Sequence, residues 1–361
     1  MRNDQLDGLR GYAASAVIIF HCFGDALSTT PYLAGAQNVG DVASRLAIAT
    51  CNGITAVSIF FVLSGAVLMN SLMRQRGRAL EICTGFTIDR VFRIFPALVV
   101  WVLITAAFFY VVGTPPSAHD IIENLLLYDF GVLGQSATLN AEILATPLLL
   151  ATFLVLRHRG MVWMVLVCIA IVTAARHLPP QDVAIVLRIY TYPIVLGMLI
   201  PTAIGRWIAD RMPPGAVWVI IPAMLLAAHC TERSMTTTRT LQETFAALLV
   251  VMLFYKRAGA VGAWLERPHA AFLGRISYSL YLANLPFLLT SDNLLRGAFD
   301  GHPVAYALIV GPPVVLATIP LAALSYRWIE RPCIRAGRMI WRRDRATGAL
   351  AAVVEPLDVR G

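Results

Sequence analysis

Two ionisable side chains, Arg10 and His21, interrupt the apolar segment LDGLRGYAASAVIIFHCF near the N-terminus. They stand eleven residues apart, which on an α-helix is about 1100° of rotation and leaves them only about 20° apart on one face. Along the helix axis they are about 16 Å apart. Asp7, three residues before Arg10, can pair with the guanidinium. The spacing predicts one helix face with an anion-binding guanidinium near one end and a proton-transferring imidazole far along it.

A second pair of basic residues, Arg90 and Arg93, stands at the start of a later apolar stretch in the segment RVFRIFP. Two guanidiniums three residues apart at a helix N-terminus would make a strong anion site, suited to a cytosolic ligand with phosphates. Snorkelling of the two side chains to anionic lipid headgroups explains the same pattern. The sequence leaves both interpretations open.

Glu142 lies just inside another apolar run, in the segment TLNAE near its expected outer end. A carboxylate there could hold the His21 imidazole in one tautomer, as the acidic member of a catalytic triad does. It could equally be a first-turn carboxylate that the helix dipole favours. Three uncharged polar residues, Ser64, Tyr281 and Asn284, are also expected at mid-membrane depth.

The composition indicates the class of protein to which these residues belong. Hydrophobic residues make up 58% of the 361 residues and charged residues 14%, against roughly 45–50% and about 25% in soluble domains. A chain this apolar is neither disordered nor a nucleic-acid-coating protein, despite its net charge of +8. The six cysteines are scattered without a CxxC pair, which argues against a zinc site or a disulfide framework. We therefore expect an all-α polytopic membrane protein that holds no metal.

Ten stretches are long and apolar enough to be candidate membrane spans. They are residues 8–26, 53–73, 93–113, 139–156, 160–175, 183–204, 215–230, 240–256, 271–290 and 303–328. The first contains charges and lacks a small-x-small cleavage site, so it is interpreted as a retained span rather than a signal peptide. The expected organisation is one transmembrane domain over residues 1–335 and a basic cytoplasmic tail over 336–361.

The distribution of basic residues predicts the orientation. With both termini in the cytoplasm, the predicted outer loops hold only five basic residues, namely Arg45, Arg176, Arg233, Arg239 and Arg296, and most of the 29 lie inside. This agrees with the positive-inside rule and with an even number of spans. It also explains the positive charge without a nucleic-acid partner.

The motifs, taken together, resemble those of the membrane acyltransferase-3 family. They are LDGLRG with a histidine eleven residues after its arginine, FFVLSG, RVFRIFP, TLNAE, GRISYSLYL and SYRWIERP, and they extend from residue 6 to about 335. The sequence departs from the family pattern at three positions. Ser58 stands where an acidic or amide residue is common, Ala137 where tryptophan is usual, and Asn284 where histidine is common.

The resemblance implies a ten-span bundle in the bacterial inner membrane. Such a protein moves an acyl group, usually acetyl from cytosolic acetyl-CoA, onto hydroxyls of a glycan, a lipid-linked sugar or a similar acceptor at the outer side. The family's motif residues match His21 and Glu142, and our hypothesis is that His21 is the general base or an acyl carrier, with Glu142 as its orienting partner. Arg10, Arg90 and Arg93 would bind acetyl-CoA, and Ser64, Tyr281 and Asn284 are oxyanion or substrate candidates by their depth.

Two other functions remain open at the level of sequence. A transporter or flippase of a lipid-linked or anionic substrate would use Arg10 and His21 as gating groups, although no matching halves are visible. A sensor would bind acyl-CoA or lipid without turnover. The acceptor, the acyl chain length and the oligomeric state cannot be read from the sequence.

Overall fold

The computed structural model describes residues 3–341 except 25, 179–181, 214, 216–218, 221–222, 224–236 and 257–258. Over these residues the chain is helical and contains no strand. The longer helices are α1 (Asp4–Phe23), α3 (Val39–Thr50), α4 (Gly53–Met73), α5 (Ala79–Val112), α7 (Ser136–Arg159), α8 (Met161–Arg176), α9 (Asp182–Gly197), α12 (Thr237–Tyr255), α14 (Pro268–Leu295) and α15 (Pro303–Ser325). Short helices are α2 (Ala26–Thr29), α6 (Ala118–Leu125), α10 (Ala203–Arg211), α13 (Gly259–Leu265), and the 3₁₀ turns η1 (Leu33–Gly35) and η2 (Arg296–Phe299).

Helices of membrane length are present. Among the described residues, four helical runs are long and apolar enough to cross a bilayer: Val39–Met73, Ala79–Val112, Ser136–Arg159 and Pro303–Trp341. A fifth is added if the bent pair Leu241–Tyr255 and Gly259–Leu265 is one span. Nine of the ten predicted stretches coincide with described helices, and the remaining one, 215–230, lies largely outside the described residues. The ten-span count and the orientation of the termini stay predictions.

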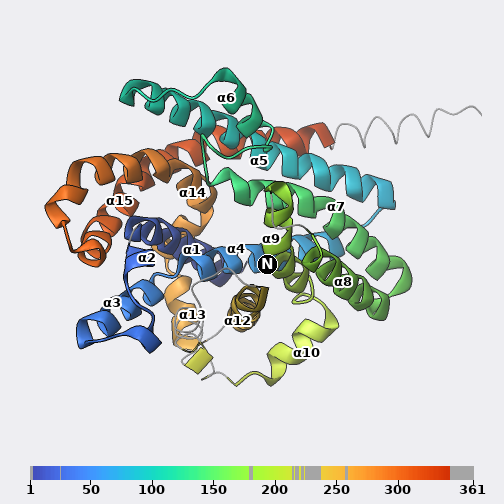
Figure 1. The fold of residues 1–361 in the computed structure, drawn as a ribbon. Coiled ribbons are helices and arrows are strands. Elements are labelled where there is room, and N and C mark those ends of the chain that lie inside the picture. Colours follow the sequence, from blue (N-terminus) through green and yellow to red (C-terminus); the bar gives the residue numbers. More distant parts are fainter. Residues whose placement is uncertain are drawn as a thin grey trace, which may run out of the picture.

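Helix α1 lies in the middle of the molecule, packed against α4, α14 and α15 (Figure 1). Glycines allow the backbones to approach closely. A Cβ on Gly274 of α14 would lie 1.8 Å from the carbonyl oxygen of Asp7, and one on Gly11 would lie 2.7 Å from Leu273 Cβ. The LDGLRG and GRISYS motifs are therefore two sides of one helix contact. This contact fixes how the α1 face with Arg10 and His21 sits against α14.

The start of the third long helix differs from the sequence-based expectation. The prediction that this helix begins at Arg93 is wrong, because α5 begins at Ala79, with Arg78 at its N-cap. Arg90 is therefore the twelfth residue of α5 and not part of a helix N-terminus. Since the partial charge of a helix terminus acts only over the first turn, the helix dipole does not contribute to anion binding at these two arginines.

The C-terminal SYRWIERP motif does not end the helix, although it contains Pro332. Tyr326–Glu330 forms a π-helical turn, η3, and the helical run continues through Pro332 to Trp341. The backbone N–H of Arg331 donates to the carbonyl oxygen of Tyr326, five residues earlier, as in a π-helix. The backbone hydrogen bonds have therefore already changed their spacing at Pro332, which has no N–H to donate. The described part of the predicted tail, 336–341, is thus helical; the rest lies outside the described residues.

Candidate functional site

A cavity with a volume of about 680 Å³ contains His21. Its walls come from α1, α4, α7, α9, α12, α14, α15 and η2. Hydrogen-bonding side chains among its lining residues include Ser58, Gln135, Thr138, Tyr190, Glu243, Tyr281, Asp292 and Arg296. The volume lies within the range of about 300–1,000 Å³ that is typical of small-molecule sites.

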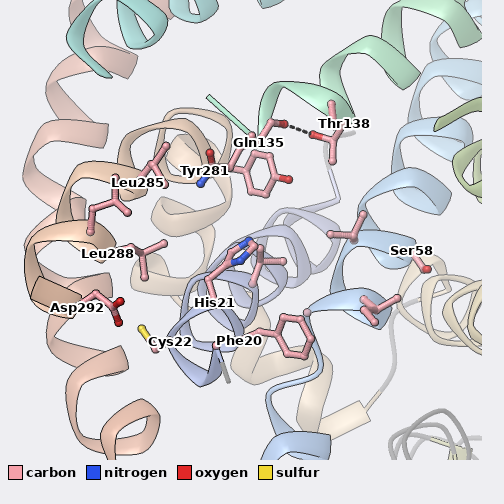
Figure 2. A pocket seen from close by; sticks show the side chains of 18 of the residues that line it. Phe20, His21, Cys22, Ser58, Gln135, Thr138, Tyr281, Leu285, Leu288 and Asp292 are labelled. Carbon is pink, nitrogen blue, oxygen red and sulfur yellow. Dashed lines mark hydrogen bonds between the residues drawn. The ribbon is translucent and has the colours of Figure 1, made fainter. Parts of the chain in front are cut away.

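His21 lies in the last turn of α1 and its side chain is exposed to this cavity. Figure 2 shows the imidazole pointing into the space, with Gln135, Thr138 and Tyr281 across from it. Its only described ring contact is the edge of Phe20, at 6.4 Å between centroids. Among the described residues no side chain hydrogen-bonds to the imidazole. Both ring nitrogens can therefore be reached from the cavity by a ligand.

A second, smaller cavity of about 80 Å³ holds the other charged residues that the sequence singled out. Its lining includes Arg10, Arg90, Arg93 and Glu142, three cations against one carboxylate. Ser64 and Tyr281 line it as well. Apart from Asn284, all the predicted site residues therefore line one of two cavities.

The Arg90 guanidinium forms an ion pair with Glu142. Its Nη2 donates to the Glu142 carboxylate at 2.8 Å and to the Glu142 carbonyl oxygen at 3.2 Å. Ser64 donates its hydroxyl to the other carboxylate oxygen at 3.1 Å. Arg90 is 5% exposed, and its Nε is buried without a hydrogen-bond partner. The structure thus brings Glu142 to Arg90 and Ser64, and not to His21.

Three residues line both cavities: Val57, Thr138 and Tyr281. Thr138 donates to the carbonyl oxygen of Gln135 at 2.9 Å (Figure 2). The side chains of Tyr281 and Thr138 thus form a polar partition between the cavity with the arginines and the cavity with the imidazole.

Asn284 lines neither cavity. Its side chain is fully buried; it donates to the carbonyl oxygen of Tyr281 at 2.6 Å and accepts from Gln135 Nε2 at 3.2 Å. Gln135 itself lines the larger cavity, and its Oε1 is buried without a hydrogen-bond partner. Asn284 thus holds Gln135 in the cavity wall and does not itself line the cavity.

Sequence reasoning missed several polar residues of these walls. Gln135 precedes the TLNAE segment and has no periodic or charge signal of its own. Asp292 and Arg296 form an ion pair at one end of the larger cavity, with the guanidinium 4.8 Å from the Tyr306 ring centroid. Their i, i+4 spacing is a signal that could have been found.

Glu330 was also missed as an internal group. It is 3% exposed and accepts a hydrogen bond from Ser279, whose hydroxyl also lies 2.7 Å from that of Ser325. The π-helical turn places this carboxyl inward, which no helical periodicity of 3.6 residues would predict.

The described residues are helical, include apolar helices of membrane length, and enclose cavities that hold an imidazole and three guanidiniums. These features are those of a multi-pass membrane protein with a polar interior. The acyltransferase-3 family model, which describes an acyltransferase domain, matches residues 3–325. The chain therefore belongs to the acyltransferase-3 family, which confirms the resemblance seen in the sequence. No curated protein and no solved structure gives a significant match.

Proposed function

We propose that this chain is an O-acyltransferase of the bacterial inner membrane. It transfers an acyl group, acetyl in the simplest case, from cytosolic acyl-CoA to a hydroxyl of a carbohydrate or similar acceptor at the outer side. The observation that carries the proposal is the pair of cavities that share the Tyr281–Thr138 partition. One cavity holds guanidiniums that can bind the phosphates of the acyl donor. The other cavity holds the accessible imidazole of His21 and has room for an acceptor.

In the proposed reaction, His21 takes the proton of the acceptor hydroxyl while its oxygen attacks the thioester carbonyl carbon. The tetrahedral intermediate collapses as the carbon–sulfur bond breaks. The imidazolium then returns its proton to the departing CoA sulfur, so the imidazole ends neutral. In a two-step variant the imidazole itself accepts the acyl group first and passes it to the hydroxyl.

The structure supports different roles for the other residues. Tyr281 is the candidate oxyanion donor, because its phenol lies at the boundary between the two cavities. Ser64 and Glu142 bind each other and Arg90, so we assign them to positioning that guanidinium. Arg10 and Arg93 remain the cations for the donor's pyrophosphate; Arg93 is exposed and Arg10 is half-buried. Asn284 positions Gln135.

The proposal is tested with membranes that contain equal amounts of wild-type protein and the variant His21→Ala. Labelled acetyl-CoA is supplied on the cytoplasmic side, and acetyl groups on surface glycans are measured by mass spectrometry. Loss of a general base lowers the rate by about 10²–10⁴-fold. The matched control is His158→Ala, at an exposed histidine in the last turn of α7. Undiminished acetylation in His21→Ala would remove the imidazole from the mechanism.

A further inference from the structure

A third polar cavity, of about 280 Å³, lies between the first turns of α5 and the C-terminal helix. Its lining includes Arg76, Glu81, Asp89, Arg338 and Trp341. None of these residues belongs to the two cavities described above. The combination of two guanidiniums, an indole and two carboxylates is chemically specific, because it offers partners for phosphate, for an aromatic base and for hydroxyl or amino donors.

The smaller of the two cavities described above, lined by Arg10, Arg90 and Arg93, is called the arginine cavity here. The nucleotide of the donor needs a separate binding site, because the arginine cavity cannot hold it. That cavity has only about 80 Å³, far below the roughly 300 Å³ at which sites for drug-sized ligands begin. One of its three guanidiniums, Arg90, is already paired with Glu142. The cavity therefore has no room for the base and the ribose of the donor.

The lining of the third cavity has features that point to a ligand. The Oδ1 atom of Asp89 is buried without a hydrogen-bond partner, and a carboxylate oxygen in this state requires a donor such as a ribose hydroxyl or an exocyclic amino group. The indole of Trp341 lies against the α5 backbone, since a Cβ on Gly85 would come within 2.6 Å of its Cε2. Arg338 and Arg76 are exposed cations at the rim.

The third cavity and the arginine cavity follow each other along α5. Asp89 lines the third cavity and Arg93 lines the arginine cavity; four residues apart, they stand on one face about 6 Å apart along the axis. From Arg10 to His21 the axial distance is about 16 Å. A pantetheine arm with its two amide groups has the extended length of about four residues, or about 14 Å. A pyrophosphate at Arg10 and Arg93 would thus place the thioester close to His21.

We propose that this third cavity is the binding site for the 3′-phosphoadenosine end of the acyl-CoA donor. In this arrangement Trp341 stacks on the adenine, Arg338 and Arg76 bind the 3′-phosphate, and Asp89 accepts a hydrogen bond from the nucleoside. The two carboxylates offset the two guanidiniums, so the site selects a nucleoside phosphate and does not attract simple anions strongly. The inference rests on the proposed function because it takes acyl-CoA as the donor.

The test compares the affinities of CoA and dephospho-CoA, which lacks only the 3′-phosphate, for the full chain in lipid nanodiscs. Wild-type protein is expected to bind CoA at least tenfold more tightly than dephospho-CoA. Arg338→Gln should reduce this preference below threefold. The matched control Arg335→Gln removes an exposed charge from the same helix outside the cavity and should keep the preference. Trp341→Leu should weaken both probes by about fivefold or more, as stacking on a base requires.

The possible outcomes distinguish a failure of the proposed nucleotide site from a failure of the proposed function. Equal affinity of wild-type protein for the two probes, or an equal loss of preference in Arg338→Gln and Arg335→Gln, would overturn the nucleotide site while CoA remains the donor. If wild-type protein binds neither probe, the donor assignment itself fails, and the proposed function with it. Because the first comparison uses only wild-type protein, a folding defect in a variant leaves the test intact.

Discussion

Arg90 and Glu142 form a buried ion pair, with 2.8 Å between Nη2 and Oε2, at the floor of the arginine cavity. The two residues are 52 positions apart in the chain and join α5 to α7. The pair occupies one of the two guanidiniums in the RVFR motif. It also shows that Glu142, seventh in α7, lies level with the arginines and not near the helix end.

Removing one member of this pair should destabilise the protein. Glu142→Gln leaves Arg90, with 6% side-chain exposure, as an uncompensated buried charge, which costs about 3–5 kcal/mol. The double variant Arg90→Gln, Glu142→Gln should recover part of that loss, with a coupling energy of about 0.5–3 kcal/mol. Thermal unfolding of the purified protein in detergent measures both. Additive effects of the two substitutions would contradict an energetically coupled pair.

The Tyr281–Thr138 partition gives a prediction for catalysis. Tyr281→Phe keeps the ring but removes the phenolic donor, so kcat should fall by about 10²–10³ if the phenol stabilises the oxyanion. Thr138→Val removes the other polar side chain of the partition but keeps the phenol, and should change kcat much less. Acetyl-CoA turnover at saturating donor separates the two variants. Equal losses in both would assign the pair to structure and exclude a donor role for Tyr281.

The sequence was sufficient to predict much of this site. Arg10 and His21 were placed on one helix because an eleven-residue spacing on an α-helix is a local property. The helix stretches were predicted because apolar length depends only on the local sequence. The family resemblance came from the order of several short motifs, and the match over residues 3–325 confirms it.

What the sequence could not predict depends on contacts between distant segments. Glu142 was expected beside His21, but the structure pairs it with Arg90, because α7 and α5 meet at that level. Asn284 was expected to face a substrate, yet it is buried against Gln135. The inward position of Glu330 follows from one π-helical turn. Pairings of this kind are set by helix packing, which no spacing within one segment encodes.

The close contact of α1 with α14 predicts a strong effect of adding one methyl group. Gly274→Ala would place a Cβ 1.8 Å from the backbone oxygen of Asp7, so the helices must separate, and overpacking of this kind costs about 1–3 kcal/mol or more. The control is Gly297→Ala, where nothing lies within 4 Å of the added atom and little change is expected. The midpoint of thermal unfolding checks both, and a Gly274→Ala protein as stable as wild type would contradict the packing.

The orientation of the chain gives the last prediction. The positive-inside rule places the segment 27–52 outside and the segment 74–92 inside. Val39 and Leu80 are matched reporters, since both are apolar, near helix starts and highly exposed, at 85% and 78%. In intact cells a membrane-impermeant maleimide should label Val39→Cys above the wild-type background, and Leu80→Cys only after the cells are opened. The reverse pattern would put the arginine cavity on the outer side, away from cytosolic acyl-CoA, and would exclude the donor route through Arg93 and Arg10.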